Sequence, residues 1–221
     1  MVANKVCLFA FGALCSALIY TTKIYLNPYK SPSSFIYFVS PSSQLEHFTF
    51  GYQELIADYM WIRTIQDFDQ CDHIIKENEE CVNSWVYKMV DKITDLSPKF
   101  RIIYATVPMM MSIAIKDNAG AVRIVEKGLN YYPNDWPILY RAAYLYLFEK
   151  NDKKTAADYF VRAQKNGGPE WLASIGARLY SEAGRLELAK QLIDDYSKSG
   201  IPNELLQRMK DHLLKSTSKM K

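Results

Sequence analysis

Apolar side chains return every three or four positions along the chain from residue 50 onward, as Leu55, Tyr59 and Ile62 do. This spacing is typical of an α-helix with one apolar face. Short polar turns separate the apolar stretches, so consecutive helices are expected to run antiparallel. The pattern predicts helix hairpins over residues 51–95, 100–131, 135–165 and 170–198, followed by a last helix over residues 203–214 that caps the array.

Prolines mark the ends of these hairpins. Pro98, Pro133, Pro169 and Pro202 are separated by 35, 36 and 33 residues. A period of this length, with two helices in every unit, is typical of helical repeats that bury their apolar faces only against their neighbours. The sequence therefore predicts an all-α protein, an α-solenoid of stacked hairpins, and a binding scaffold rather than an enzyme.

Local signals refine two of the predicted helices. Asp117 and Asn118 supply a turn and an N-cap for the helix over residues 119–131. Pro108 falls inside the helix over residues 100–115, where it removes a backbone hydrogen bond and crowds the carbonyl of Tyr104. We expect a kink at this point.

The first helix of the array has an unusually wide apolar band, which indicates that it is covered on two sides. Asp58 and Arg63 are the polar residues of interest on this helix. They lie five positions apart and do not share a face, so each is expected to contact another element rather than its neighbour on the helix.

The beginning of the chain is apolar. Residues 6–22 contain no charged side chain and would span about 25 Å as a helix, enough for a short membrane span. A signal-anchor is favoured over a signal peptide cleaved after Ala17, because the apolar run continues beyond that point. The predicted organisation is a signal-anchor over residues 1–26, a Ser/Pro-rich linker over 27–47, a repeat domain over 48–215 and a basic tail over 216–221.

The linker contains one apolar insert, residues 35–39. It is too hydrophobic for a free spacer, so we expect it to lie on the repeat stack; the alternative is an aromatic patch at the membrane interface.

Charge and cysteine content restrict the choice of partner and compartment. The 221 residues carry 27 Lys and Arg against 24 Asp and Glu, a net charge of +3, which gives no concentrated basic face for nucleic acid. Cys71 and Cys81 are the only cysteines of the repeat part and are expected to form a disulfide in an oxidising compartment. A metal site that adds His73 and Glu80 is disfavoured, because structural zinc sites use tighter ligand pairs. No cofactor is expected.

In the later hairpins the second helix begins with a small residue that is followed four positions later by a large one. The pairs are Ala121 with Val125, Ala156 with Phe160, and Ala189 with Ile193. Over residues 50–202 the chain resembles the tetratricopeptide repeat family, with Gly128 and Tyr196 as departures where that family prefers Ala. The resemblance implies a right-handed superhelical stack, with a groove lined by the first helix of each pair that holds a peptide or a partner's helix, and no catalysis.

Residues on the first helices that could line such a groove combine aromatic, Met and Arg side chains, the types enriched at binding hot spots. They are Tyr104, Met110, Tyr140, Arg141, Tyr144, Arg178 and Tyr180. The aromatic members recur at helical spacing, so the alternative for them is a place in the core. No catalytic residue is proposed, since His47, His73 and His212 lie far apart and near no nucleophile motif.

We therefore expect a single-pass protein of the bacterial inner membrane with its repeat domain in the periplasm. It would recruit or assemble an envelope protein complex by binding a protein or peptide partner. Two alternatives remain open. One is a structural subunit of an envelope machine whose groove is filled by its own residues. The other is a redox or metal protein that uses Cys71 and Cys81.

Overall fold

A computed structural model describes residues 15–18, 21, 40–66, 83–198 and 202–219 of the chain. The chain divides into two compact units, residues 1–38 and 39–221. Of the first unit only residues 15–18 and 21 are described, and they are helical. No helix within the described residues is long and apolar enough to cross a membrane. The predicted span over residues 6–22 lies largely outside these ranges, and the insert at 35–39 lies entirely outside them.

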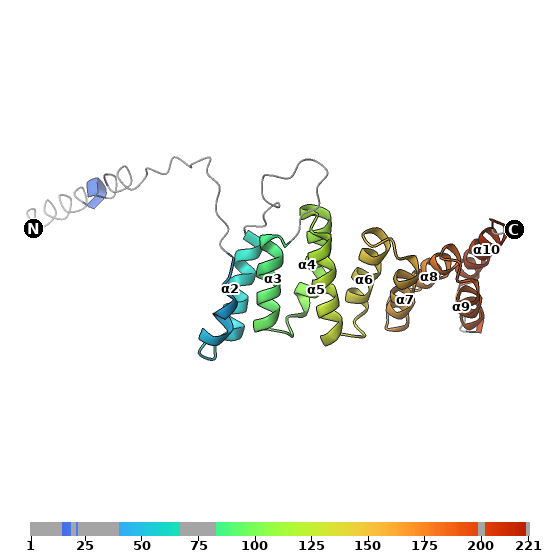
Figure 1. Ribbon diagram of the computed structural model, residues 1–221, viewed down its shortest axis with the longest axis horizontal. Coiled ribbons are helices and arrows are strands. Elements are labelled where there is room, and N and C mark those ends of the chain that lie inside the picture. Colours follow the sequence, from blue (N-terminus) through green and yellow to red (C-terminus); the bar gives the residue numbers. More distant parts are fainter. Residues whose placement is uncertain (1–14, 19–20, 22–39, 67–82, 199–201, 220–221) are drawn as a thin grey trace, which may run out of the picture. The chain divides into compact units, whose positions relative to one another are not determined.

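The described part of the second unit contains helices and no strand, so the predicted all-α class is confirmed there. The elements, labelled in Figure 1, are a 3₁₀ helix η1 (Ser43–Phe48), α2 (Gln53–Gln66), α3 (Trp85–Leu96), α4 (Arg101–Met110), a π-helix η2 (Met111–Ile115), α5 (Asn118–Tyr131), α6 (Trp136–Phe148), α7 (Lys153–Lys165), α8 (Trp171–Glu182), α9 (Leu186–Lys198) and α10 (Asn203–Lys219).

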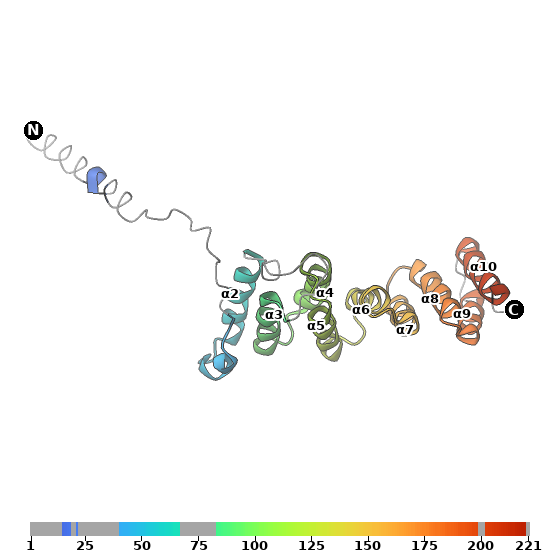
Figure 2. The same cartoon turned by 45° about the horizontal axis from the view of Figure 1, so that its top comes forward.

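Helices that follow one another in the sequence pack together in pairs. α2 packs on α3, α4 on α5, α6 on α7 and α8 on α9, which confirms the predicted hairpins. Successive hairpins touch through α5 with α6 and α7 with α8, and Figures 1 and 2 show the pairs side by side in chain order. α10 packs on α8 and α9, as expected of a cap.

The core runs between the hairpins as two clusters that meet at α6. The small residues predicted at the helix crossings, Ala121, Ala156 and Ala189, are fully buried. Their methyl groups let the helix backbones approach closely, and the larger side chain one turn later fills the space beside them.

Asp117 joins the first hairpin to the second. Its carboxylate is fully buried and accepts hydrogen bonds from the backbone N–H of Gly120 and of Ser84, each at 2.8 Å. The first bond caps α5 as the sequence predicts. The second reaches the residue that itself caps α3, so one side chain fixes the starts of two helices.

The helix that contains Pro108 changes type rather than continuing as a regular α-helix. α4 ends at Met110, and the next five residues form the π-helix η2. Lys116 then adopts a left-handed conformation (φ 62°), and the N–H of Asp117 donates to the carbonyl of Met111 at 3.1 Å. α4 thus stays α-helical through Pro108, and the change of helix type begins three residues later; the kink at Pro108 stays a prediction.

Tyr104 and Gly128 explain one departure from the repeat pattern. The Tyr104 ring is fully buried beside Tyr131 and Tyr132, and its hydroxyl donates to the carbonyl of Pro98 at 3.0 Å. A Cβ at Gly128 would lie 2.7 Å from the Cβ of Tyr104. The large aromatic residue on α4 therefore requires glycine on α5 where the pattern has alanine.

Candidate functional site

Large apolar side chains are exposed near the C-terminal ends of the first helices of the second and third hairpins. Met110, Ile113 and Phe148 expose between 42% and 64% of their surface. The ring of Tyr144 lies with its centroid 4.5 Å from that of Phe148. We call these four residues the apolar surface. Met110 and Ile113 lie at the end of α4 and in η2, and Tyr144 and Phe148 lie in α6. A hydrogen bond connects these two regions, since Ser112 Oγ donates to Glu149 Oε1 at 2.7 Å.

Tyr140 and Arg141 lie where neighbouring hairpins meet. The Tyr140 ring packs edge-on against Phe160 and Trp171, and so connects α6 with α7 and α8. Arg141 Nε donates to the carbonyl of Ala105 on α4 at 3.0 Å, and its guanidinium lies 5.3 Å from the Tyr140 ring centroid. Both residues are half-buried, so they hold the hairpins together beside the apolar surface.

Two of the predicted groove residues belong to the core. Tyr104 is fully buried, and Tyr180 is 7% exposed with its hydroxyl donating to Asp158 Oδ1 at 2.6 Å. Burial raises the pKa of Tyr180, and the hydrogen bond to Asp158 raises it further. The sequence left a place in the core open as the alternative for these aromatic residues, and the structure places both rings there. The candidate surface therefore consists of the exposed residues.

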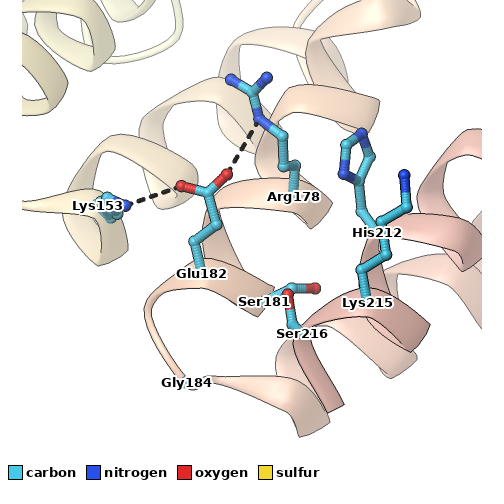
Figure 3. Close-up of a pocket in the computed structure, with 8 residues that line it drawn as sticks. All are labelled: Lys153, Arg178, Ser181, Glu182, Gly184, His212, Lys215 and Ser216. Carbon is cyan, nitrogen blue, oxygen red and sulfur yellow. Dashed lines mark hydrogen bonds and ion pairs between the residues drawn. The ribbon is translucent and has the colours of Figure 1, made fainter. Parts of the chain in front are cut away.

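A pocket of about 520 Å³ lies where α8 meets α10, next to the start of α7 (Figure 3). Eight residues line it: Lys153, Arg178, Ser181, Glu182, Gly184, His212, Lys215 and Ser216. We call it the basic pocket. Its lining contains two Lys and one Arg against a single carboxylate, so its charge favours an anionic ligand group.

Glu182 organises one side of the basic pocket. Its carboxylate lies 2.8 Å from Lys153 Nζ and 3.6 Å from Arg178 Nε. The second distance is that of an ion pair and is long for a hydrogen bond, and Arg178 Nε is buried without a hydrogen-bond partner in the described structure. In Figure 3 the Arg178 guanidinium, the His212 ring and the Lys215 ammonium extend in the same direction. An incoming carboxylate could satisfy donors on these side chains.

Sequence reasoning found only Arg178 among the residues of this pocket. Lys153 stands in a predicted turn, and the last helix was expected to end at residue 214, whereas α10 continues to Lys219. The continuation places Lys215 one turn after His212 on the helix. The three-residue spacing of His212 and Lys215 was the sequence signal that could have placed both side chains on one face of the last helix.

The sulfur-based alternatives fall outside what the structure describes. Cys71, His73, Glu80 and Cys81 all lie within residues 67–82, which are not described. Over the residues that are described, no three His, Cys, Asp or Glu side chains come together as they would to hold a metal ion.

No protein-family model, curated protein or solved structure matches the chain significantly. The apolar surface and the basic pocket offer exposed apolar area and positive charge.

Proposed function

We propose that the chain is a membrane-tethered scaffold that recruits or assembles an envelope protein complex through the first helices of its repeats. The observation that carries this proposal is that the basic pocket and the apolar surface both include residues at the same end of the α6–α7 hairpin. Phe148 ends α6, Lys153 begins α7 after a short turn, and Lys153 pairs with Glu182 of the pocket at 2.8 Å. One bound segment could reach both.

The chemistry of the two regions defines the partner. Exposed Met, Ile and aromatic side chains fit large apolar residues, and Met adapts to irregular shapes. The basic pocket fits carboxylates, which Arg can hold through two parallel hydrogen bonds. The partner we propose is a protein segment in which large apolar side chains are followed by acidic ones.

The setting is part of the same proposal. The apolar run over residues 6–22 supports a single-pass anchor in a bacterial inner membrane, with the repeats in the periplasm and Cys71 and Cys81 joined there. The hairpin order supports a right-handed superhelical stack like that of tetratricopeptide repeats, in which the first helices share one face.

Reversing the charge of the basic pocket is expected to abolish partner capture without unfolding the protein. Arg178→Glu with Lys215→Glu places acidic groups where the partner's carboxylates bind, because both side chains line the pocket and extend in the same direction. We expect at least a tenfold loss of the proteins that co-purify with the full-length chain from solubilised membranes, measured by quantitative mass spectrometry.

The matched control is Lys190→Glu with Lys198→Glu, which makes the same change of net charge. Both lysines lie on α9, the second helix of its hairpin, and neither lines the pocket. The control should retain its partners, and both variants should keep the helical circular dichroism of the wild type. Equal capture by all three proteins would contradict the proposed site.

A further inference from the structure

The outer face of α2 is apolar and uncovered in the described structure. Tyr52, at the entrance of the helix, and Leu55, Tyr59 and Ile62 along it are each between 49% and 69% exposed. We call these four residues the α2 seam. The opposite face of the helix is buried, through Ala57, Met60 and Thr64. The wide apolar band predicts that α2 is covered on two sides, but the described residues of this chain cover only one of them.

The two ends of the hairpin array differ in this respect. At the C-terminal end α10 buries Met209 and turns polar residues such as Gln207, Lys210 and Asp211 outward. Terminal repeats normally need such a polar outer face for solubility. The α2 end has large apolar side chains instead, and Phe48 and Phe50 add to them just before the helix.

The spacing of the α2 seam is that of a coiled coil. Its residues follow one another at intervals of three, four and three positions on one face of the helix, so Tyr52 and Tyr59 occupy the a positions of a heptad and Leu55 and Ile62 the d positions. Asp58 then stands at a g position and Arg63 at an e position. Both flank the seam and are exposed.

We propose that α2 pairs with α2 of a second copy of this chain in a parallel, in-register, two-stranded coiled coil. In that geometry a g residue faces the e residue five positions later on the other helix, so Asp58 lies beside Arg63 of the second copy on both sides of the seam. The five-residue spacing that prevents a pair within one helix is the spacing that a parallel dimer uses.

Other occupants fit the same residues less well. An antiparallel pair that keeps the seam in contact matches Tyr52 with Ile62 and Leu55 with Tyr59 of the second copy, which brings Asp58 next to Asp58, where like charges repel. An anionic membrane surface attracts helices whose polar flanks are basic, whereas α2 carries Glu54 and Asp58 against Arg63 alone.

The size of the interface suits two chains held on one membrane. The exposed parts of the α2 seam, Phe48 and Phe50 amount to roughly 1,500 Å² over two copies, within the range of specific dimers. In a parallel pair both chains enter α2 from the same end, which is compatible with two chains tethered to one membrane. Tethering also raises the effective concentration of the second copy. This supporting argument rests on the proposed function, but the pairing of the helices does not.

The mass of the full-length chain in detergent micelles, measured by light scattering, tests the dimer. The wild type should be dimeric at micromolar concentration, and Leu55→Asp with Ile62→Asp should weaken the association at least 100-fold, because each substitution places a charge in the seam. Leu188→Asp, at an exposed leucine of α9, is the control and should leave the dimer intact. A monomeric wild type, or a seam variant that remains dimeric, would overturn the proposal.

Single cysteines test whether the helices run parallel. Ile62→Cys faces its own copy at a d position and should form a disulfide-linked dimer on mild oxidation, whereas Ile65→Cys, equally exposed but at a g position, should not. The wild type gives the background from the native cysteines. Equal linkage of the two variants, or linkage of neither, would contradict the parallel arrangement. These substitutions leave the apolar surface and the basic pocket unchanged, so failure of the dimer and failure of partner capture are separate results.

Discussion

Asp117→Ala is expected to lower the free energy of unfolding by about 3–5 kcal/mol, a large part of the stability of an ordinary domain. The carboxylate is fully buried and accepts from the backbone N–H of Ser84 and of Gly120. Removing it leaves two buried donors without partners, at about 1–3 kcal/mol each, and also removes the N-cap of α5. Urea unfolding of the full-length protein, followed by circular dichroism, measures the loss.

Asp152→Ala is the matched control, because Asp152 also caps a helix but is only half-buried. Its carboxylate accepts from the backbone N–H of Thr155 at 3.0 Å and from the Thr155 hydroxyl at 2.7 Å. These hydrogen bonds hold the pKa of Asp152 below its ordinary value. Its contribution is therefore present at neutral pH and is lost as the pH falls through that lowered pKa.

At pH 7 the control should lose only about 1 kcal/mol. Equal losses for Asp117→Ala and Asp152→Ala would show that Asp117 acts as a cap alone and does not join the first two hairpins.

Gly128→Ala is expected to destabilise the protein by about 2 kcal/mol, although the same change within most helices stabilises them by about 1 kcal/mol. The new Cβ would lie 2.7 Å from the Cβ of Tyr104. That atom is attached directly to the backbone of α4 and cannot rotate away, so the two helices must separate. Urea unfolding of the full-length chain gives the sign of the change.

Tyr104→Gly provides the background that isolates this contact, because it removes the Cβ of residue 104 together with the ring. In that background Gly128→Ala should no longer be destabilising and should approach the favourable value of an ordinary helix position. A stabilising effect of Gly128→Ala in the wild-type background would contradict the account of the α4 and α5 packing.

Local signals made most of the helices predictable. Asp117, Asp135 and Asp152 each cap the helix that follows them, and caps act within three residues, so a sequence pattern locates them well. The end of α10 was placed five residues too early, because the sequence after Leu214 is polar and contains no stop signal such as Gly or Pro. The π-helix η2 was not predicted, because the sequence indicated only a kink at Pro108.

The candidate site was less predictable, because helical spacing gives the residues on one face but not the neighbour of that face. Tyr104 and Tyr180 were assigned to an open groove, and the structure buries both. The basic pocket unites α7, α8 and α10, and such long-range proximity leaves no pattern in one sequence. The membrane anchor and the Cys71–Cys81 disulfide stay predictions.

Site-specific photo-cross-linking in living cells tests the proposed scaffold function most directly. A photoreactive phenylalanine derivative is placed at Phe148 of the apolar surface or, as a control, at Leu188, which is exposed on α9. The account predicts a discrete adduct with an envelope protein from position 148 only, and its loss when Arg178→Glu and Lys215→Glu are added. Absence of an adduct at position 148, or an equal adduct at position 188, would contradict it.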